Sequence, residues 1–225
     1  MDLEFQRLKA LVTIPYLPPI PNFLLSSQPI FTLVLDLDET LIHLECDDED
    51  DQDNGNQTEH EDGVYYLIRP GTIRFLNELS KYYEIVIFTA AMPDYADWIM
   101  DNVDRHRVVS HRLYRQHTSP HEDYAIKDLR NLGRSLERTI IIDNLEENFM
   151  HTTPTNGIWV ESWYDDMDDN VLELLTPFLK RIVQSNMVQD VRQLLTNDIK
   201  DKVIYPCLKE GRDIPSVEKL LQGEY

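Results

Sequence analysis

The chain has 225 residues, enough for one α/β domain with a sizeable core and terminal extensions. Its net charge is −20, from 41 acidic and 21 basic residues, which argues against direct nucleic-acid binding because that binding needs Lys and Arg to neutralise phosphates. The longest apolar runs are too short to span a bilayer, so we expect no transmembrane segment. The sequence opens without a secretion leader, and its two cysteines lack metal-ligand spacing. These features predict a nuclear or cytoplasmic protein with free thiols.

The first half of the sequence predicts an arm, a buried strand and an acidic insert. Residues 1–30 are rich in proline and should form an N-terminal arm that packs on the domain. The apolar run 31–35 predicts a buried parallel strand, and Asp36 follows it directly. Residues 45–62 contain ten acidic residues and no Lys or Arg, which is typical of a mobile, solvated insert.

Strand and helix patterns then alternate along the chain. The further strands that we expect are 64–68, 85–88, 108–113, 140–142 and 158–160. The helices that we expect are one in which Ile73, Leu76 and Leu79 face inward, one from Pro93, a short one over 128–132, and one from Asp168 with a kink at Pro177. The main domain should cover residues 31–191, and residues 192–225 should form a helical extension.

Alternation of this kind predicts a parallel sheet with helices on both faces. Ligands bind such sheets outside the carboxyl ends of the strands. Three apolar strands are followed there by a polar residue, namely Asp36, Thr89 and Asp143. We therefore expect these three side chains to share one edge of the sheet.

The segment Asp36-Leu37-Asp38 carries the strongest chemical signal. Residues two apart at a strand end point to the same side, so two carboxylates should lie close together. Such a pair is costly unless a cation binds or one carboxyl holds a proton. Mg²⁺ prefers hard oxygen ligands, which Asp36 and Asn144 could supply, while Asp38 could act as an acid and a base. A helix cap or a solvated turn is the plainer alternative, and the buried strand before the segment favours chemistry over it.

Residues 33–43 resemble the first motif of the haloacid-dehalogenase superfamily. They are most similar to the small C-terminal-domain phosphatases, the NLI-interacting-factor-like branch. Further segments resemble that family in its order: Tyr66-Leu67-Ile68-Arg69-Pro70-Gly71, Phe88-Thr89-Ala90 with Tyr95-Ala96-Asp97, Tyr124 to Leu129, Ile140 to Asn144, and Glu161-Ser162-Trp163-Tyr164. The resemblance implies a Rossmann-like α/β domain with a small β insertion and no large cap.

The resemblance also implies a role for each matching residue. The catalytic residues would be Asp36 as nucleophile, Asp38 as acid and base, Thr89 as a hydrogen-bond donor to the phosphoryl group, and Lys127 as the neutralising cation. The metal site would use Asp36, the Asp38 carbonyl and Asn144, supported by Asp143, and would hold Mg²⁺. The substrate would be bound by Arg115, Tyr95 and Thr40.

The implied function is a Mg²⁺-dependent phosphatase of phosphoserine and phosphothreonine in proteins, which works through an aspartyl phosphate. RNA polymerase II's C-terminal repeat is the family's best-known substrate. One departure is Leu145-Glu146, where the family usually has Ser-Pro. Two alternatives stay open, namely a phosphoprotein-binding module with weak catalysis and a small-molecule phosphatase of the same superfamily. The oligomeric state does not follow from the sequence.

Overall fold

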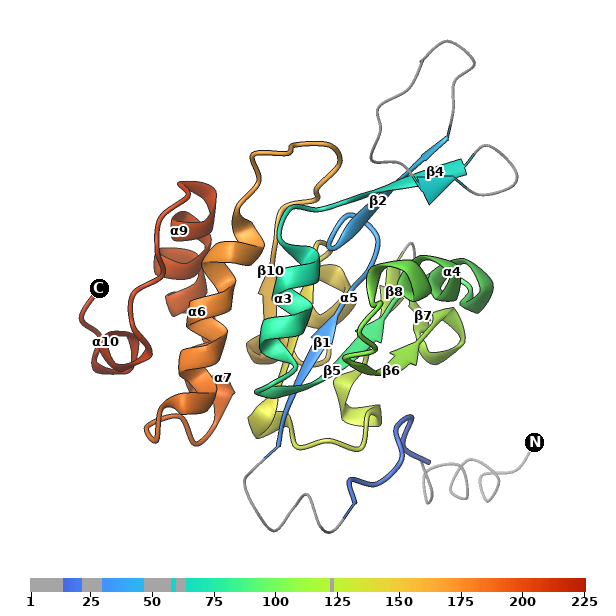
Figure 1. Ribbon diagram of the computed structural model, residues 1–225. Helices are drawn as coiled ribbons and strands as arrows, with labels where there is room; N and C mark the ends of the chain where they lie inside the picture. The colour runs from blue at the N-terminus through green and yellow to red at the C-terminus, as the bar shows by residue number, and fades with distance from the viewer. Residues whose placement is uncertain (1–13, 22–29, 47–57, 60–63, 122–123) are drawn as a thin grey trace.

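The computed structural model describes residues 14–21, 30–46, 58–59, 64–121 and 124–225, and its centre is a five-stranded sheet (Figure 1). The strands are β1 (Phe31–Leu35), β5 (Tyr83–Phe88), β6 (Val109–Leu113), β9 (Thr139–Asp143) and β10 (Gly157–Trp159). Their order is β10-β9-β1-β5-β6, and every neighbouring pair is parallel. All five carboxyl ends therefore meet at one edge, with β1 in the middle.

The central strands are apolar on both faces because helices or loops cover both faces of the sheet. Along β1, Leu33 and Leu35 join one hydrophobic cluster, whereas Val34 joins the other. This alternation follows from the two-residue period of a strand. The core is thus split into two layers, and the sheet between them is rigidly held.

Helices occupy both layers. They are α3 (Thr72–Leu79), α4 (Pro93–Val103), α5 (Glu147–Met150), α6 (Val171–Gln184), α7 (Val191–Leu194), α8 (Asn197–Ile199), α9 (Tyr205–Lys209) and α10 (Val217–Gln222). Shorter turns are the 3₁₀ helices η1 (Arg115–His117), η2 (Leu129–Asn131), η3 (Leu136–Arg138) and η4 (Pro154–Asn156), and the π-helical η5 (Lys200–Ile204). In Figure 1, α3 and α6 lie side by side in front of the sheet and α5 lies behind it.

The inward face of α3 differs from the expected one. Ile73 is 46% exposed, and Phe75 packs in the core beside Leu76 and Leu79. The helix starts directly after Gly71, whose positive φ of 84° turns the chain out of the strand β4 (Val64–Ile68). This start sets the rotation of the helix, so Phe75 rather than Ile73 faces the sheet.

A small β insertion projects from the carboxyl edge (Figure 1). It consists of β2 (Ile42–Cys46), β4 (Val64–Ile68) and β3 (Thr58–Glu59), antiparallel in the order β2-β4-β3. Strand β2 includes the first two residues of the predicted acidic insert because they pair with β4. Residues 47–57 and 60–62 of that insert lie outside the described part. A two-stranded hairpin, β7 (Ser119–His121) and β8 (Tyr124–Ile126), follows η1, and no large cap covers the edge in the described ranges.

Both ends of the chain pack on the sheet domain where the structure describes them. Residues 14–21 contact the sheet domain through Tyr16, whose backbone N–H donates to the Asn131 carbonyl at 2.8 Å. The rest of the predicted N-terminal arm, residues 1–13 and 22–29, lies outside the described part. Val191, Ile204 and Leu220 join the same hydrophobic cluster as β1. The C-terminal segment is therefore packed into the main core, and the predicted division near residue 191 stays a prediction. Within the described ranges, none of the helices has the length and apolar character needed to cross a membrane.

Gly157, the first residue of β10, is packed tightly against the ring of Phe149. A β-carbon at position 157 would lie 1.9 Å from Phe149 Cε2, and Phe149 is fully buried. We expect Gly157→Ala to lower the free energy of unfolding by about 1–3 kcal/mol, as overpacking a core does, when measured by urea denaturation. Adding Phe149→Leu should restore part of this loss, because the smaller side chain makes room. Wild-type stability of Gly157→Ala would contradict the clash.

Candidate active site

Asp36 stands at the carboxyl end of the central strand, next to a wholly buried lysine. Its backbone N–H donates to the Ile142 carbonyl at 3.0 Å, which ties the residue to β9. Lys127 Nζ donates to Asp36 Oδ1 and, at 2.7 Å, to Asp143 Oδ2. The side chains of Lys127 and Asp143 have no exposed surface. One ammonium group thus bridges two carboxylates at the ends of β1 and β9.

Burial and charge act against each other in this cluster. Burial lowers the pKa of Lys127, but Asp143 and Asp36 outweigh it, and the pKa rises above its ordinary value. Burial also raises the pKa of Asp143, and the attraction of Lys127 opposes that rise. The pKa of Asp143 still ends above its ordinary value, so Lys127 is the group that holds its charge, and its ammonium group lies between the two carboxyl groups.

Asp38 has different surroundings. It receives hydrogen bonds from Tyr95 Oη at 2.6 Å and from Thr89 Oγ1 at 3.3 Å. Burial raises the pKa of Asp38 to about 6; the Tyr95 hydrogen bond opposes this rise and the charge of Asp36 adds to it. The carboxyl of Asp38 is thus able to hold a proton near neutral pH, while that of Asp36 faces an ammonium group.

The second oxygen of Asp36 faces Thr40. The Thr40 hydroxyl donates to Asp36 Oδ2 at 3.0 Å and lies 3.3 Å from Asn144 Oδ1. Asn144 Nδ2 donates in turn to Ser162 Oγ at 3.0 Å, which orients the amide. Thr40 is fully buried, so it lies beneath the site and not in an open groove.

This arrangement of oxygens fits Mg²⁺. A hydroxyl has one proton, yet two acceptor oxygens from Asp36 and Asn144 converge on Thr40. Carboxylate and amide oxygens are hard donors of the kind that Mg²⁺ takes, usually few in number and completed by water. Among the described residues there is no group of three or more His, Cys, Asp or Glu placed to bind a metal. Support of the metal by Asp143 stays a prediction.

Two predicted substrate-binding residues lie on the side of the site formed by β5 and β6. Tyr95 belongs to α4 and reaches Asp38, as described above. Arg115 is exposed and begins η1, and its Nε donates to the Ala90 carbonyl at 2.6 Å, next to Thr89. Arg115 is thereby held near Thr89, the predicted phosphoryl-binding residue, by a contact with the backbone that no sequence pattern indicates.

The departure at Leu145-Glu146 leaves the support of Asp143 in place. The backbone N–H of Leu145 donates to Asp143 Oδ1 at 2.9 Å, and its side chain is 45% exposed. Asn148 Nδ2 donates to the same oxygen at 3.0 Å. Asn148 had no sequence signal, because its role depends on the fold of the short helix α5.

The sequence profile of the NLI interacting factor-like phosphatase family matches residues 31–192. The chain belongs to this family. The match includes every site residue described above, and it confirms the resemblance on which the expectations were based.

Members of the NLI interacting factor-like family are similar to the chain over most of its length. A probable C-terminal domain small phosphatase of Dictyostelium discoideum is 40% identical over 167 residues, which is 73% of this chain and 53% of that protein. CTD small phosphatase-like protein 3 of Caenorhabditis elegans is 36% identical over 229 residues, which covers 95% of this chain and 79% of that protein. The chain thus spans about half the length of the Dictyostelium relative.

Among solved structures, the fission yeast RNA polymerase II CTD phosphatase Fcp1 bound to beryllium fluoride matches with a TM-score of 0.51. The identity is 18%, over 99% of this chain and 74% of that chain. At this identity the likeness concerns the fold, which is the predicted haloacid-dehalogenase type.

Proposed function

We propose that this protein is a Mg²⁺-dependent phosphatase of phosphoserine and phosphothreonine in proteins, acting through a phospho-aspartate on Asp36. The observation that supports this most is the contrast between Asp36 and Asp38. Two close carboxylates with opposite surroundings can take opposite roles in one reaction. Asp36 is paired with an ammonium group and suits a nucleophile, whereas Asp38 has a raised pKa of about 6 and suits a proton donor.

In the first half of the reaction, a carboxylate oxygen of Asp36 attacks phosphorus and the bond from phosphorus to the seryl oxygen breaks. The proton of the Asp38 carboxyl moves to that leaving oxygen. Lys127, which donates to Asp36, would neutralise charge at Asp36 and on the phosphoryl group. Thr89, beside Asp38, would donate a hydrogen bond to a phosphoryl oxygen.

In the second half, Asp38 returns as a base. Its carboxylate takes a proton from water, the water oxygen attacks phosphorus, and the bond to Asp36 breaks to release inorganic phosphate. Tyr95 Oη donates to Asp38 Oδ1 at 2.6 Å, and this hydrogen bond would orient the Asp38 carboxyl group relative to Asp36. The two halves restore both carboxyl groups to their starting states.

Asp36, the Asp38 carbonyl and Asn144 would hold Mg²⁺, with Asp143 as support. When bound, the ion would neutralise charge on the phosphoryl oxygens and fix their position. Thr40 and Ser162 contribute by orienting the oxygens of Asp36 and Asn144.

A protein substrate is supported by the open carboxyl edge, since no large cap covers it in the described ranges. The names of relatives, including the human carboxy-terminal domain RNA polymerase II polypeptide A small phosphatase 2, make repeats of that domain the first substrate to test. A panel of phosphoserine, phosphothreonine and phosphotyrosine peptides, compared with small phosphate esters, tests the proposal. A marked preference for small esters would instead favour a metabolite phosphatase. We also propose a nuclear or cytoplasmic location.

We expect EDTA to abolish phosphatase activity and added Mg²⁺ to restore it, with poor recovery in Ca²⁺. The reason is that Mg²⁺ fits a compact site with few carboxylates, whereas Ca²⁺ takes more ligands at longer distances. Activity on a phosphoserine peptide, measured across a titration of each ion, checks this. Full activity after thorough chelation would rule out the metal site.

A further inference from the structure

Arg69 is a buried arginine outside the catalytic cluster. It lies in the short connection between β4 and α3, and its side chain is only 1% exposed. A charge in such a place is costly unless it is fully paired. Asp169 provides the pairing, because it accepts from Arg69 Nε at 2.8 Å and from Nη2 at 2.7 Å. These two hydrogen bonds fix the plane of the guanidinium group and leave Nη1 to contact other groups.

The remaining nitrogen of Arg69 joins two loops at the carboxyl edge. Nη1 donates to the Thr40 carbonyl at 3.2 Å and to the Glu161 carbonyl at 3.3 Å. Thr40 lies in the loop that follows β1, and Glu161 in the loop that follows β10. A backbone hydrogen bond joins the same two loops, because the Trp163 N–H donates to the Glu39 carbonyl at 2.8 Å.

Each of the two loops contacts the predicted metal ligands immediately beside the carbonyl that Arg69 binds. The hydroxyl of Thr40 contacts Asp36 Oδ2 and Asn144 Oδ1. Ser162, which follows Glu161, accepts from Asn144 Nδ2. The two carbonyls that Arg69 binds are thus each next to a side chain that contacts Asp36 or Asn144.

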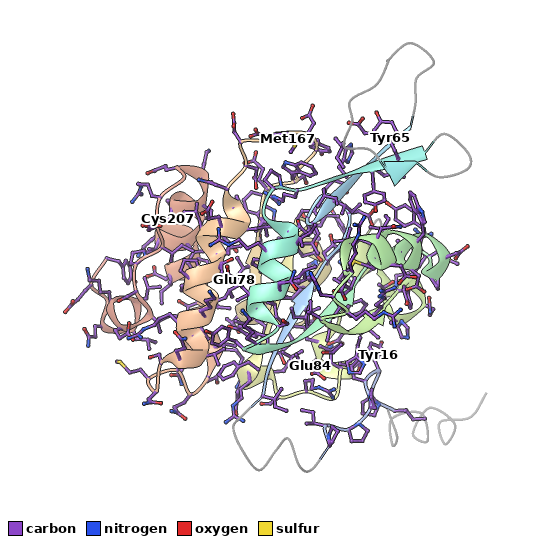
Figure 2. All side chains as sticks on the ribbon, viewed as in Figure 1. Tyr16, Tyr65, Glu78, Glu84, Met167 and Cys207 are labelled. Atoms are coloured by element: carbon purple, nitrogen blue, oxygen red, sulfur yellow. The ribbon has the colours of Figure 1, made fainter. Side chains whose placement is uncertain are left out.

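We propose that Arg69, clamped by Asp169, is a positioning residue that sets the geometry of the metal-binding oxygens of Asp36 and Asn144. The proposal rests on the proposed function. The Arg69–Asp169 pair also joins the site to a surface loop, because Asp169 belongs to the loop between β10 and α6. Figure 2 shows Met167 of this loop at the outer edge of the molecule. Groups that orient metal ligands in this way commonly change metal affinity by about 10–100-fold when they are removed.

The main test is Arg69→Lys, which keeps the positive charge and loses the planar fork. We expect the Mg²⁺ concentration for half-maximal phosphatase activity to rise about tenfold or more, with partial recovery of kcat at high Mg²⁺. The thermal shift that Mg²⁺ produces in the protein without substrate should need correspondingly more ion. Arg74→Lys is the matched control, because Arg74 is 73% exposed and pairs on the surface with Glu78. It should leave both titrations unchanged.

A second variant covers the case in which Arg69→Lys does not fold. Asp169→Asn keeps the shape of the side chain and removes the charge that clamps Arg69, so it should also raise the Mg²⁺ requirement, by a smaller factor. The melting temperature without Mg²⁺ separates positioning from general stability. Lower melting temperatures with unchanged Mg²⁺ titrations in the folded variants would overturn the proposal. If the wild-type protein neither dephosphorylates peptides nor responds to Mg²⁺, the proposed function fails as well. If it does both and Arg69→Lys matches it, only this inference fails.

Discussion

Asp36→Asn should reduce phosphatase activity by about 10⁴-fold or more, which is the scale seen when a catalytic nucleophile is removed. A neutral amide does not form the acyl phosphate that the proposed reaction requires. The fold should persist, because the asparagine oxygen can still accept from Lys127, and Asp143 still pairs with the lysine. The amide NH2 group then takes the place of the oxygen that faces Thr40, whose hydroxyl can turn to accept from it. Steady-state hydrolysis of a phosphoserine peptide measures the loss, and circular dichroism with a thermal melt checks the fold.

Beryllofluoride provides a second, independent readout of Asp36. It mimics a phosphoryl group bonded to a carboxylate, so it should inhibit the wild-type enzyme and raise its melting temperature in the presence of Mg²⁺. Neither effect should occur with Asp36→Asn. Retention of substantial activity by Asp36→Asn would refute the phospho-aspartate mechanism.

Asp38→Asn should lower the hydrolysis of phosphoserine peptides by about 10²–10⁴-fold, the usual contribution of general acid–base catalysis. The loss should depend on the leaving group. p-Nitrophenol leaves readily without a proton, so the first step with p-nitrophenyl phosphate should be impaired far less than with phosphoserine. The second step still lacks its base, so phospho-Asp36 should accumulate. A burst of p-nitrophenol followed by slow turnover is the expected result in rapid-mixing experiments.

Glu39→Gln is the matched control for Asp38→Asn. It makes the same change of charge one residue further along, where Glu39 Oε1 contacts the ring of His43 at 3.1 Å and the Glu39 charge makes only a minor contribution to the raised pKa of Asp38. Its activity should stay close to that of the wild type on both substrates. Equal losses in the rate of the first step, the phosphorylation of Asp36, with phosphoserine and with p-nitrophenyl phosphate in Asp38→Asn would show that Asp38 does not act as the general acid.

The sequence predicted that Asp36, Thr89 and Asp143 lie at one edge of the sheet, because each of them stands at the end of a strand. Asp36 and Asp143 follow or close apolar runs, and parallel strands bring such positions to one edge whatever the order of the strands. The contact of Thr89 with Asp38 is a result of this rule. The catalytic roles of these residues stay predictions, which the variants above test.

Lys127 was predicted only by its likeness to a family motif, because a lone lysine is more often solvated. The fold places it directly after the short hairpin strand β8, where its backbone N–H donates to the Asn148 carbonyl of α5 at 2.7 Å. That contact joins residues from two different elements. No local pattern indicates such a contact, so the burial of this lysine between two carboxylates required the structure.

The sequence by itself determined the fold class, the family and the edge of the sheet where the site lies, because strand periodicity and motif order are local properties of the chain. Only the tertiary structure decided how the side chains at that edge are held. The clamp of Arg69 by Asp169, the burial of Thr40 and the exposure of Ile73 depend on how distant elements pack. The physical reason is that burial and hydrogen-bond partners arise from contacts between segments far apart in sequence, which a local pattern does not encode.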